Sequence, residues 1–262
     1  MNPDLFLVTC TDWPEGEPGH QVLDAALAAR DITASWVRWD DPGVDWTAAL
    51  VAVRSTWDYD ARVEEFLAWA GGVPRLMNGA DVFAWNTDKA YLAQLAAAGV
   101  PVVPTLVLDG AAVVKPRVGA GGRGVLVLDE AALGAGTVVV QPLVSSVRTE
   151  GEYSVFVLGG EPRSMVRKLP AGQEIRVHEH YGGRTEVVPR TAEAADLARS
   201  AVRAAEAVLG TGLDYARVDA MRLDDGTLAV SELEVTEPGL YLEELPENGA
   251  AFAAVVERAL RR

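Results

Sequence analysis

The stretch Val114-Lys-Pro-Arg-Val-Gly-Ala-Gly-Gly-Arg-Gly124, followed by Val125-Leu-Val-Leu128, decides between two kinds of phosphate-binding loop. Its glycines fit the pattern G-x-G-x-x-G, which in a dinucleotide-binding fold leads directly into a helix that holds the pyrophosphate. Here the next four residues are all apolar and predict a strand. The glycine stretch therefore predicts a hairpin between two antiparallel strands, the geometry of a flap over phosphates. A glycine-rich hairpin without a ligand is the structural alternative.

Lysine is rare in this chain. Of the 23 basic residues only Lys89, Lys115 and Lys168 are lysines. A lysine ammonium is a compact point charge for phosphate, whereas arginine is a planar fork. Lys115 stands just before the glycine stretch and Lys168 ends a second apolar-rich run. Chance in an arginine-rich sequence would explain any one of them, but these two positions favour phosphate binding.

Composition indicates a globular protein of 262 residues, with one large domain or two to three lobes, 49% hydrophobic residues and a mean hydropathy of +0.10. No apolar run approaches the length of a membrane span, and Met1-Asn-Pro-Asp lacks the basic start of a signal peptide. The single cysteine, Cys10, fits a reducing compartment. We therefore expect a cytoplasmic protein without a membrane partner.

The net charge of −15 argues against a nucleic-acid partner, which needs a cationic footprint. It leaves room for a metal cation. With three His and one Cys, a zinc site is disfavoured, whereas a hard metal on carboxylates stays open.

Apolar periodicity predicts alternating strands and helices over about the first 75 residues, which is typical of a parallel sheet. Gly71-Gly-Val-Pro74 ends this pattern and marks a domain boundary. Asn86 or Thr87 is the expected N-cap of a helix that Gly99-Val-Pro101 stops. The predicted strands are Leu5–Cys10, Ala34–Trp39, Leu50–Ser55, Val102–Leu108, Ala112–Pro116, Gly124–Leu128, Thr137–Gln141, Tyr153–Leu158, Pro162–Arg167, Thr185–Val188, Ala216–Leu223 and Leu228–Glu234. The predicted helices are Gly19–Arg30, Ala61–Trp69, Ala80–Trp85, Thr87–Ala98, Ala192–Leu209 and Gly249–Leu260.

The last two predicted strands carry a cluster of carboxylates, and Asp224-Asp-Gly226 predicts a hairpin turn between them. Arg217 and Asp219 lie on one face of the first strand, and Glu232 and Glu234 on one face of the second, because side chains alternate along a strand. Three carboxylates facing one another repel unless a cation lies between them. Mg²⁺ prefers such carboxylates together with phosphate oxygens. A solvated polar face is the structural alternative.

Taken in chain order, the motifs of this sequence resemble the ATP-grasp superfamily, in particular its glutathione-synthetase-like members, from about Asn78 to Gly239. The resemblance implies an α/β fold with an N-terminal parallel-sheet domain (1–75) and two α+β lobes (76–141 and 142–262) that enclose ATP. The motifs are Thr87-Asp-Lys89, Val114-Lys115-Pro116, the glycine stretch, Gln141-Pro-Leu-Val144, Glu150-Gly-Glu-Tyr-Ser154, Arg167-Lys168, Glu174-Ile-Arg176, Arg217-Val-Asp219 and Glu232-Leu-Glu234.

The resemblance implies a nucleotide site on the two ATP-grasp lobes and at their junction. Lys89 and Lys115 would bind the ATP phosphates, and Glu152, or else Glu150, would bind the ribose. A mobile loop would cover the phosphates, and the hinge between the lobes would hold the adenine. The loop residues are Gly121, Gly122 and Gly124, and the hinge residues are Gln141, Leu143 and Val144.

The resemblance also implies a reaction centre on the last lobe. Asp219 and Glu232 would bind Mg²⁺, or Mn²⁺ in its place, and Glu234 stands where many members have Asn. Arg176 would meet the γ-phosphate or an acyl phosphate, with Arg217 beside it. Lys168 would contact either phosphate or substrate.

Two further stretches, Arg54-Ser-Thr-Trp-Asp-Tyr59 and Glu237-Pro-Gly-Leu-Tyr241, resemble the branch of the family that closes the cycloserine ring. The substrate would lie between the first domain and the last lobe. Arg54, at a strand end, predicts a carboxylate clamp. Asp58, Glu237 and Tyr241 would be further contacts for an amino-acid-like group. Packing aromatics are the structural alternative for Trp57 and Tyr59.

The implied function is an ATP- and Mg²⁺-dependent carboxylate–amine ligase that forms an amide-type C–N bond through an acyl phosphate and releases ADP and phosphate. The alternatives are a ring-closing enzyme or phosphotransferase on a single substrate, and an ATP-binding accessory protein without turnover. The carboxylate cluster disfavours the accessory protein. The resemblance is also compatible with a homodimer.

Overall fold

Three segments near the start of the chain form a parallel sheet in the computed structural model, which describes residues 3–109, 112–114, 126–128 and 137–262. Strands β1 (Leu5–Thr9), β2 (Ala34–Arg38) and β3 (Leu50–Ser55) pair in the order β2-β1-β3. Every residue of β1 and β3 is buried, because both faces of this sheet are covered. The predicted strands and their parallel arrangement are confirmed.

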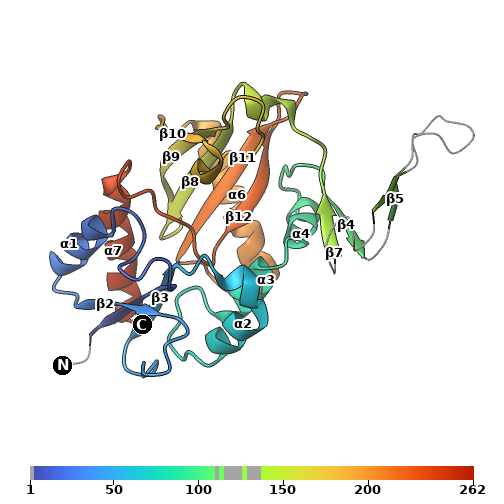
Figure 1. The fold of residues 1–262 in the computed structure, drawn as a ribbon. Helices are drawn as coiled ribbons and strands as arrows, with labels where there is room; N and C mark the ends of the chain where they lie inside the picture. The colour runs from blue at the N-terminus through green and yellow to red at the C-terminus, as the bar shows by residue number, and fades with distance from the viewer. Residues whose placement is uncertain (1–2, 110–111, 115–125, 129–136) are drawn as a thin grey trace, which may run out of the picture.

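Helices from both ends of the chain cover this sheet. Helix α1 (His20–Ala28) follows β1, and α2 (Val63–Gly71) follows β3 after a short 3-10 turn, η1 (Tyr59–Arg62). The last helix, α7 (Pro246–Leu260), lies beside α1 (Figure 1). It begins three residues before the predicted start, at a proline that suits the first turn of a helix. The two chain ends therefore share one core.

A five-stranded antiparallel sheet of the described residues carries the second half of the chain, in the order β10-β9-β8-β11-β12. Val155 and Val157 on one face pack into the core that includes helix α6, whereas Phe156 and Leu158 on the other face pack into the core that includes α7. The sheet thus lies between α6 and the parallel-sheet part (Figure 1). The elements are β8 (Glu152–Leu158), β9 (Glu161–Leu169), β10 (Arg184–Val187), α6 (Ala192–Leu209), β11 (Tyr215–Arg222) and β12 (Leu228–Glu234).

Two short helices, α3 (Ala80–Asn86) and α4 (Tyr91–Ala97), connect the two sheets. The prediction that Asn86 or Thr87 caps the second helix is wrong, since α4 begins after Ala90. Asn86 instead ends α3, where its amide donates to Leu233 O at 2.7 Å and accepts from Val235 N at 3.0 Å. This side chain therefore holds α3 against the end of β12.

Two small antiparallel pairs lie to one side of the molecule (Figure 1). Strands β4 (Leu106–Asp109) and β7 (Thr137–Val140) form one, and β5 (Ala112–Val114) and β6 (Leu126–Leu128) form the other. The antiparallel pairing of β5 with β6 confirms that the glycine stretch joins two antiparallel strands. The predicted strand Val102–Leu108 is only partly right, because Val102 makes a parallel bridge to Val230 of β12 instead.

None of the described helices combines the length and the apolarity that crossing a membrane would take.

Candidate active site

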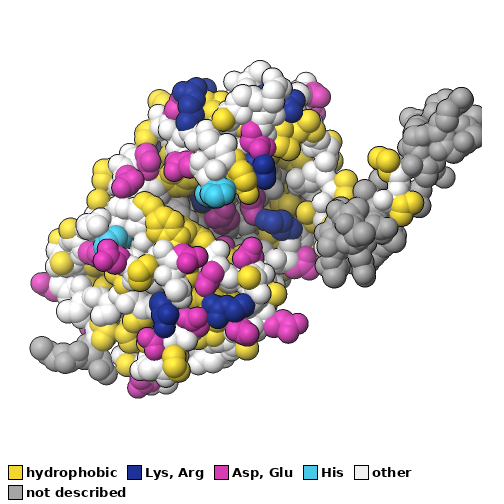
Figure 2. All heavy atoms as spheres, in the orientation of Figure 1, with side chains coloured by type: hydrophobic (Ala, Val, Ile, Leu, Met, Phe, Trp, Pro, Cys, Tyr) yellow, Lys and Arg dark blue, Asp and Glu magenta, His cyan; other side chains and the backbone are white. Residues whose placement is uncertain are grey.

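The hairpin of β11 and β12 brings the three predicted metal ligands together. Asp219 pairs with Glu232 across the hairpin, and Arg217 pairs with Glu234. Oxygen atoms of Asp219, Glu232 and Glu234 all lie within 4.8 Å of one another. Figure 2 shows acidic and basic side chains gathered in a hollow between the antiparallel-sheet part and the parallel-sheet part. The predicted juxtaposition is confirmed, and metal binding by it stays a prediction.

Two buried cations balance the deepest carboxylate, Asp219, which is 1% exposed. Arg217 donates to its two oxygens, both at 2.9 Å, and Lys168 donates at 2.8 Å. Burial by itself raises the pKa of Asp219, but Arg217 and Lys168 outweigh burial and hold the pKa well below its usual range. Asp219 is therefore an anion at neutral pH and can bind a cation.

Lys168 lies in the centre of this cluster and not at an open surface. It is 5% exposed and also pairs with Glu152 at 2.9 Å. The ammonium bridges two carboxylates in this structure, and its predicted contact with phosphate or substrate stays a prediction. It can reach a ligand only where that ligand meets Asp219.

Glu152 belongs to the same cluster. Its carboxylate is buried, accepts from Ser231 Oγ at 2.6 Å and pairs with Lys168. A ribose-binding acid would present its oxygens to the ligand, and in this structure those of Glu152 are engaged by Ser231 and Lys168, so ribose binding by Glu152 stays a prediction. The alternative, Glu150, accepts from Tyr153 at 3.1 Å and lies 3.4 Å from Arg222.

Lys89 lies between α3 and α4 and forms an ion pair with Glu232. Its side chain is half exposed, unlike that of Lys168. The structure therefore places one predicted phosphate-binding lysine beside one predicted metal ligand. The other predicted lysine, Lys115, and the loop glycines Gly121, Gly122 and Gly124 lie outside the described residues.

The predicted adenine hinge runs along the end of β7. Gln141 donates to Thr105 Oγ1 at 3.0 Å, which ties the hinge to the segment before β4. Leu143 is 59% exposed, whereas Val144 is buried with Val103 and Ala229. An exposed leucine near a glutamine side chain held by Thr105 is compatible with a flat apolar ligand, and adenine binding here stays a prediction.

Arg176 is not brought into contact with the carboxylate cluster. Its guanidinium pairs with Glu174 at 2.6 Å and lies 3.6 Å from the centre of the Tyr181 ring. These partners belong to the segment between β9 and β10, and the Arg176 side chain is 57% exposed. A direct role at the phosphate would require this segment to move.

Arg54 is fully buried and does not present its guanidinium to an open site. It pairs with Glu17 at 2.8 Å and donates to Pro238 O at 2.6 Å. The structure therefore corrects the prediction of a carboxylate clamp, because the guanidinium already has buried partners. Asp58, the second predicted contact, accepts from Trp39 at 2.9 Å and from Arg62 at 3.0 Å.

Glu237 and Tyr241 do lie close to the cluster. Burial raises the pKa of Glu237 to about 7. A hydrogen bond from Tyr59 lowers this pKa, and the charge of Glu232 raises it. The Tyr241 ring lies 6.0 Å from the Arg217 guanidinium carbon and packs edge-on against Phe156 at 5.8 Å. The segment after β12 therefore carries the predicted substrate contacts that the structure places near the predicted metal ligands.

The cluster fits a divalent cation. Burial raises the pKa of Glu234 to about 8. The charge of Arg217 lowers this pKa, whereas the charges of Asp219, Glu232 and Glu237 raise it further. Among the described residues, the buried Ser154 hydroxyl, which is opposite Asp219 in the strand register, has no hydrogen-bond partner. Excess negative charge and an unused polar group are what Mg²⁺ with its oxygen ligands would satisfy.

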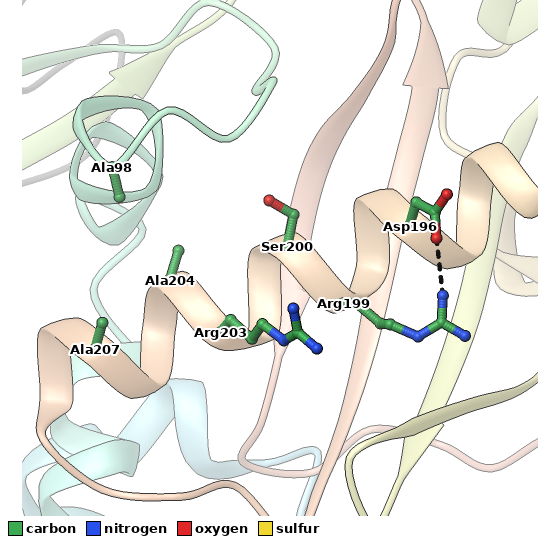
Figure 3. A pocket seen from close by; sticks show the side chains of 7 residues that line it. All are labelled: Ala98, Asp196, Arg199, Ser200, Arg203, Ala204 and Ala207. Carbon is green, nitrogen blue, oxygen red and sulfur yellow. Dashed lines mark hydrogen bonds and ion pairs between the residues drawn. The ribbon is translucent and has the colours of Figure 1, made fainter.

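A separate hollow of about 490 Å³ runs along α6 (Figure 3). Its charged side chains are Asp196, Arg199 and Arg203, and Arg199 donates to Asp196 at 2.8 Å. Since α6 covers the sheet face opposite the carboxylate cluster, this hollow is not part of the candidate site.

Comparisons with known proteins agree with this site. A family model described as the N-terminal domain of D-cycloserine synthetase DcsG matches residues 5–78. The cycloserine biosynthesis protein DcsG of Streptomyces lavendulae is 32% identical in an alignment that covers 88% of this chain and 90% of that protein. The chain belongs to the DcsG family of ATP-grasp ligases. It is therefore an enzyme, an ATP-dependent ligase of a biosynthetic family.

The fold agrees with the DcsG family over almost the whole chain. The crystal structure of D-cycloserine synthetase DcsG is 28% identical and matches with a TM-score of 0.81 over 97% of this chain and 99% of that one. The ATP-grasp ligase PsnB, in complex with Mg, ADP and a variant of its minimal precursor, shares the fold at 17% identity, with a TM-score of 0.61 over 99% of both chains. That ligase thus holds Mg and ADP on the same fold.

Sequence reasoning missed several residues of the site in this DcsG-family chain. Glu17 is 1% exposed and binds both Arg54 and the backbone of Leu240. Ser231 binds Glu152, and Asn86 holds the end of β12. Their partners are distant in the chain, so only an unusual residue type could have marked them, and none of the three is unusual in a loop or at a strand edge.

Proposed function

We propose that this enzyme uses ATP and Mg²⁺ to activate the carboxylate of a small amino-acid-like substrate as an acyl phosphate, and then closes an amide-type C–N bond within the same molecule, releasing ADP and phosphate. The observation that carries the proposal is the carboxylate cluster Asp219, Glu232 and Glu234 beside Lys89. The relation to cycloserine synthetase supports the intramolecular form of the reaction.

The chemistry of the relative's product favours one substrate over two. Cycloserine is a five-membered ring in which the carboxyl carbon is bonded to a nitrogen that is itself attached to the side-chain oxygen. Closing that ring forms the same C–N bond as a carboxylate–amine ligase, with both reacting groups in one molecule. Holding both groups on one frame provides the orientation that a two-substrate ligase must create by binding.

In this proposal Asp219 and Glu232 hold Mg²⁺, and Glu234 is the third ligand. The bound ion would neutralise the phosphates and polarise the phosphoryl group under attack. Arg217 orients Asp219 through two hydrogen bonds and balances its charge. Lys89 can exchange Glu232 for a phosphate oxygen, because its side chain is half exposed.

The substrate in this proposal lies against the segment after β12. Glu237 is the group suited to the substrate ammonium, because it lies near Glu232 and, among the described residues, no arginine or lysine forms an ion pair with it. Tyr241 provides an aromatic wall beside Arg217. Asp58, held by Trp39 and Arg62, borders the same side.

The remaining parts of the proposal rest on the resemblance. The lobes 76–141 and 142–262 enclose the nucleotide, with the domain 1–75 on the substrate side. Lys115 and the glycine loop cover the phosphates and exclude water, which matters because an acyl phosphate hydrolyses in contact with water. Gln141, Leu143 and Val144 hold the adenine, and the reaction takes place in the cytoplasm.

The test is ADP release from Mg²⁺–ATP with open-chain amino acids offered singly and in pairs. O-amino-D-serine is the direct open-chain form of the cycloserine ring, and its L-enantiomer and D-serine are the matched controls. We expect ADP release with the first compound alone, together with a cyclic product seen by mass spectrometry. ADP release only when two compounds are present would show an intermolecular ligase. A phosphorylated product that does not cyclise would show a phosphotransferase, and ATP binding without ADP release would show an accessory protein.

A further inference from the structure

The segment Glu237–Tyr241 has no regular structure, yet side chains from distant parts of the chain hold its backbone. Arg54 donates to Pro238 O at 2.6 Å, and Leu240 N donates to Glu17 at 2.7 Å. Asn248 of α7 donates to Leu240 O at 2.8 Å, and Trp57 donates to Glu237 O at 3.3 Å. The segment that carries Glu237 and Tyr241 is thus clamped at four backbone atoms.

Glu17 and Arg54 form the centre of this clamp. Both side chains are buried, and Arg54 Nε donates to Glu17 Oε1 at 2.9 Å. The Arg54 guanidinium also lies 4.7 Å from the centre of the Phe252 ring of α7. Arg54 is the last but one residue of β3 and Glu17 lies between β1 and α1, so the first domain supplies both charges. A buried ion pair is a weak source of stability, so a role beyond stability accounts better for its presence.

The residue at the end of the clamped segment has a strained backbone. Tyr241 has φ = 53°, in the left-handed region that residues other than glycine rarely adopt. Such a conformation persists where the surroundings over-determine it, and it occurs often at functional sites. The clamp on Leu240 fixes the residue directly before Tyr241. It thereby sets the direction of a ring that lies beside Arg217 and Phe156.

We propose that Glu17 and Arg54 are a positioning pair: they hold the backbone of Pro238 and Leu240 so that Glu237 and Tyr241 face the substrate beside the metal ligands. Neither residue touches substrate or nucleotide. The pair determines the affinity for the amino-acid substrate and leaves the Mg²⁺–ATP half of the site unchanged, because Asp219, Glu232 and Lys89 have no contact with it among the described residues. The substrate part of this inference rests on the proposed function.

The test uses Glu17→Gln, which keeps the size of the side chain but can no longer accept from both Arg54 and Leu240. The control is Glu257→Gln. Glu257 pairs with Arg30 at 2.7 Å, and this pair also joins the first domain to α7 but does not touch the segment. Trp57→Phe, which removes the bond to Glu237 O and shrinks the ring that packs against Trp13, is a second variant that leaves the buried pair in place. Melting temperatures confirm that each variant is folded at the assay temperature.

Two measurements are made on each variant. Hydrogen–deuterium exchange of the peptide that covers residues 237–245 reports the clamp without any substrate. Steady-state kinetics with O-amino-D-serine, and calorimetric binding of Mg²⁺–ATP, report the two halves of the site. Loss of a charge-assisted hydrogen bond predicts an exchange rate and a substrate KM that each rise about tenfold or more in Glu17→Gln, with kcat and the Mg²⁺–ATP Kd within about twofold. Trp57→Phe gives a smaller change in the same direction, and Glu257→Gln gives none.

A fall in kcat together with equal rises in the substrate KM and the Mg²⁺–ATP Kd would overturn the proposal, since these changes would show that the pair is merely structural. Unchanged exchange in folded Glu17→Gln would also overturn it. If the wild type releases no ADP with any amino acid, the proposed function fails. The exchange comparison then decides the clamp by itself: faster exchange supports it and unchanged exchange refutes it.

Discussion

Replacing Asp219 by asparagine tests the candidate site through stability as well as turnover. Asp219 is 1% exposed and accepts three hydrogen bonds, two from Arg217 at 2.9 Å and one from Lys168 at 2.8 Å. Asparagine keeps one acceptor oxygen but turns its amide group toward one of the cations. Removing one member of a buried charge cluster costs about 3–5 kcal/mol, a large part of the roughly 5–15 kcal/mol that holds a typical domain together.

The assay is urea unfolding followed by fluorescence, in the presence of a chelator. With a slope of about 3 kcal/mol per molar urea, the loss lowers the midpoint by about 1–2 M. The matched control is Glu186→Gln on β10. This residue forms a more exposed pair with Arg167 at 2.5 Å, and its replacement should change the free energy of unfolding by less than about 1 kcal/mol.

Asp219→Asn should also abolish ADP release and the rise in melting temperature that Mg²⁺–ATP gives the wild type, because a neutral amide is a poor ligand for Mg²⁺. A midpoint equal to that of the control would refute the argument that Asp219 is the counter-ion of two buried cations. Unchanged turnover would refute the assignment of the metal site.

Three further outcomes follow from the structure. Lys89→Ala should weaken Mg²⁺–ATP binding about tenfold or more in calorimetry while changing stability by less than about 1 kcal/mol, since its pair with Glu232 is exposed; equal affinity would contradict a phosphate contact. Burial raises the pKa of Glu237 to about 7, so the folded protein holds a proton that the unfolded chain releases, and stability of the metal-free protein falls as pH rises from about 5 to 7. Glu237→Gln should reduce this fall in melting temperature, and an unchanged slope would show that another group causes it. Phe252→Ala, which empties a buried position of α7, should cost about 3–5 kcal/mol in urea unfolding, and a loss below 1 kcal/mol would show that α7 is not part of the shared core.

Most of the fold could be predicted from the sequence because its strands and helices have strong local patterns. The apolar runs of β1 and β3 and the long amphipathic α6 are found where the sequence pattern places them. The antiparallel pairing of β5 and β6 follows from the strand composition after the glycine stretch. Predictions failed where a tertiary contact replaced a local one: Asn86 bonds to β12 and does not cap α4, and Val102 pairs with Val230 and does not extend β4.

Some contacts of the candidate site could likewise be predicted from the sequence, and others could not. Alternation along each strand predicts that Arg217 and Asp219 share one face and that Glu232 and Glu234 share one face. The register shift between Asp219 and Ala220 is what brings Asp219 opposite Glu232, and no local pattern predicts that β-bulge. The partners of Lys168 and Arg54 could not be predicted, since each partner lies on another strand or loop. Lys168 binds Asp219 and Glu152, and Arg54 binds Glu17 and Pro238.

The sequence by itself therefore determined which elements form, where the glycine-rich hairpin lies and which carboxylates share a strand face, because these depend on local periodicity and short turns. The register that brings Asp219 opposite Glu232 was decided by a β-bulge in the tertiary structure. Only the tertiary structure decided which cations remain available for a ligand. Lys89 is half exposed beside Glu232, whereas Lys168 and Arg54 are buried with carboxylate partners. The physical reason is that burial makes an unpaired charge costly, so the partner of each buried cation is set by packing between distant segments, which no local pattern records.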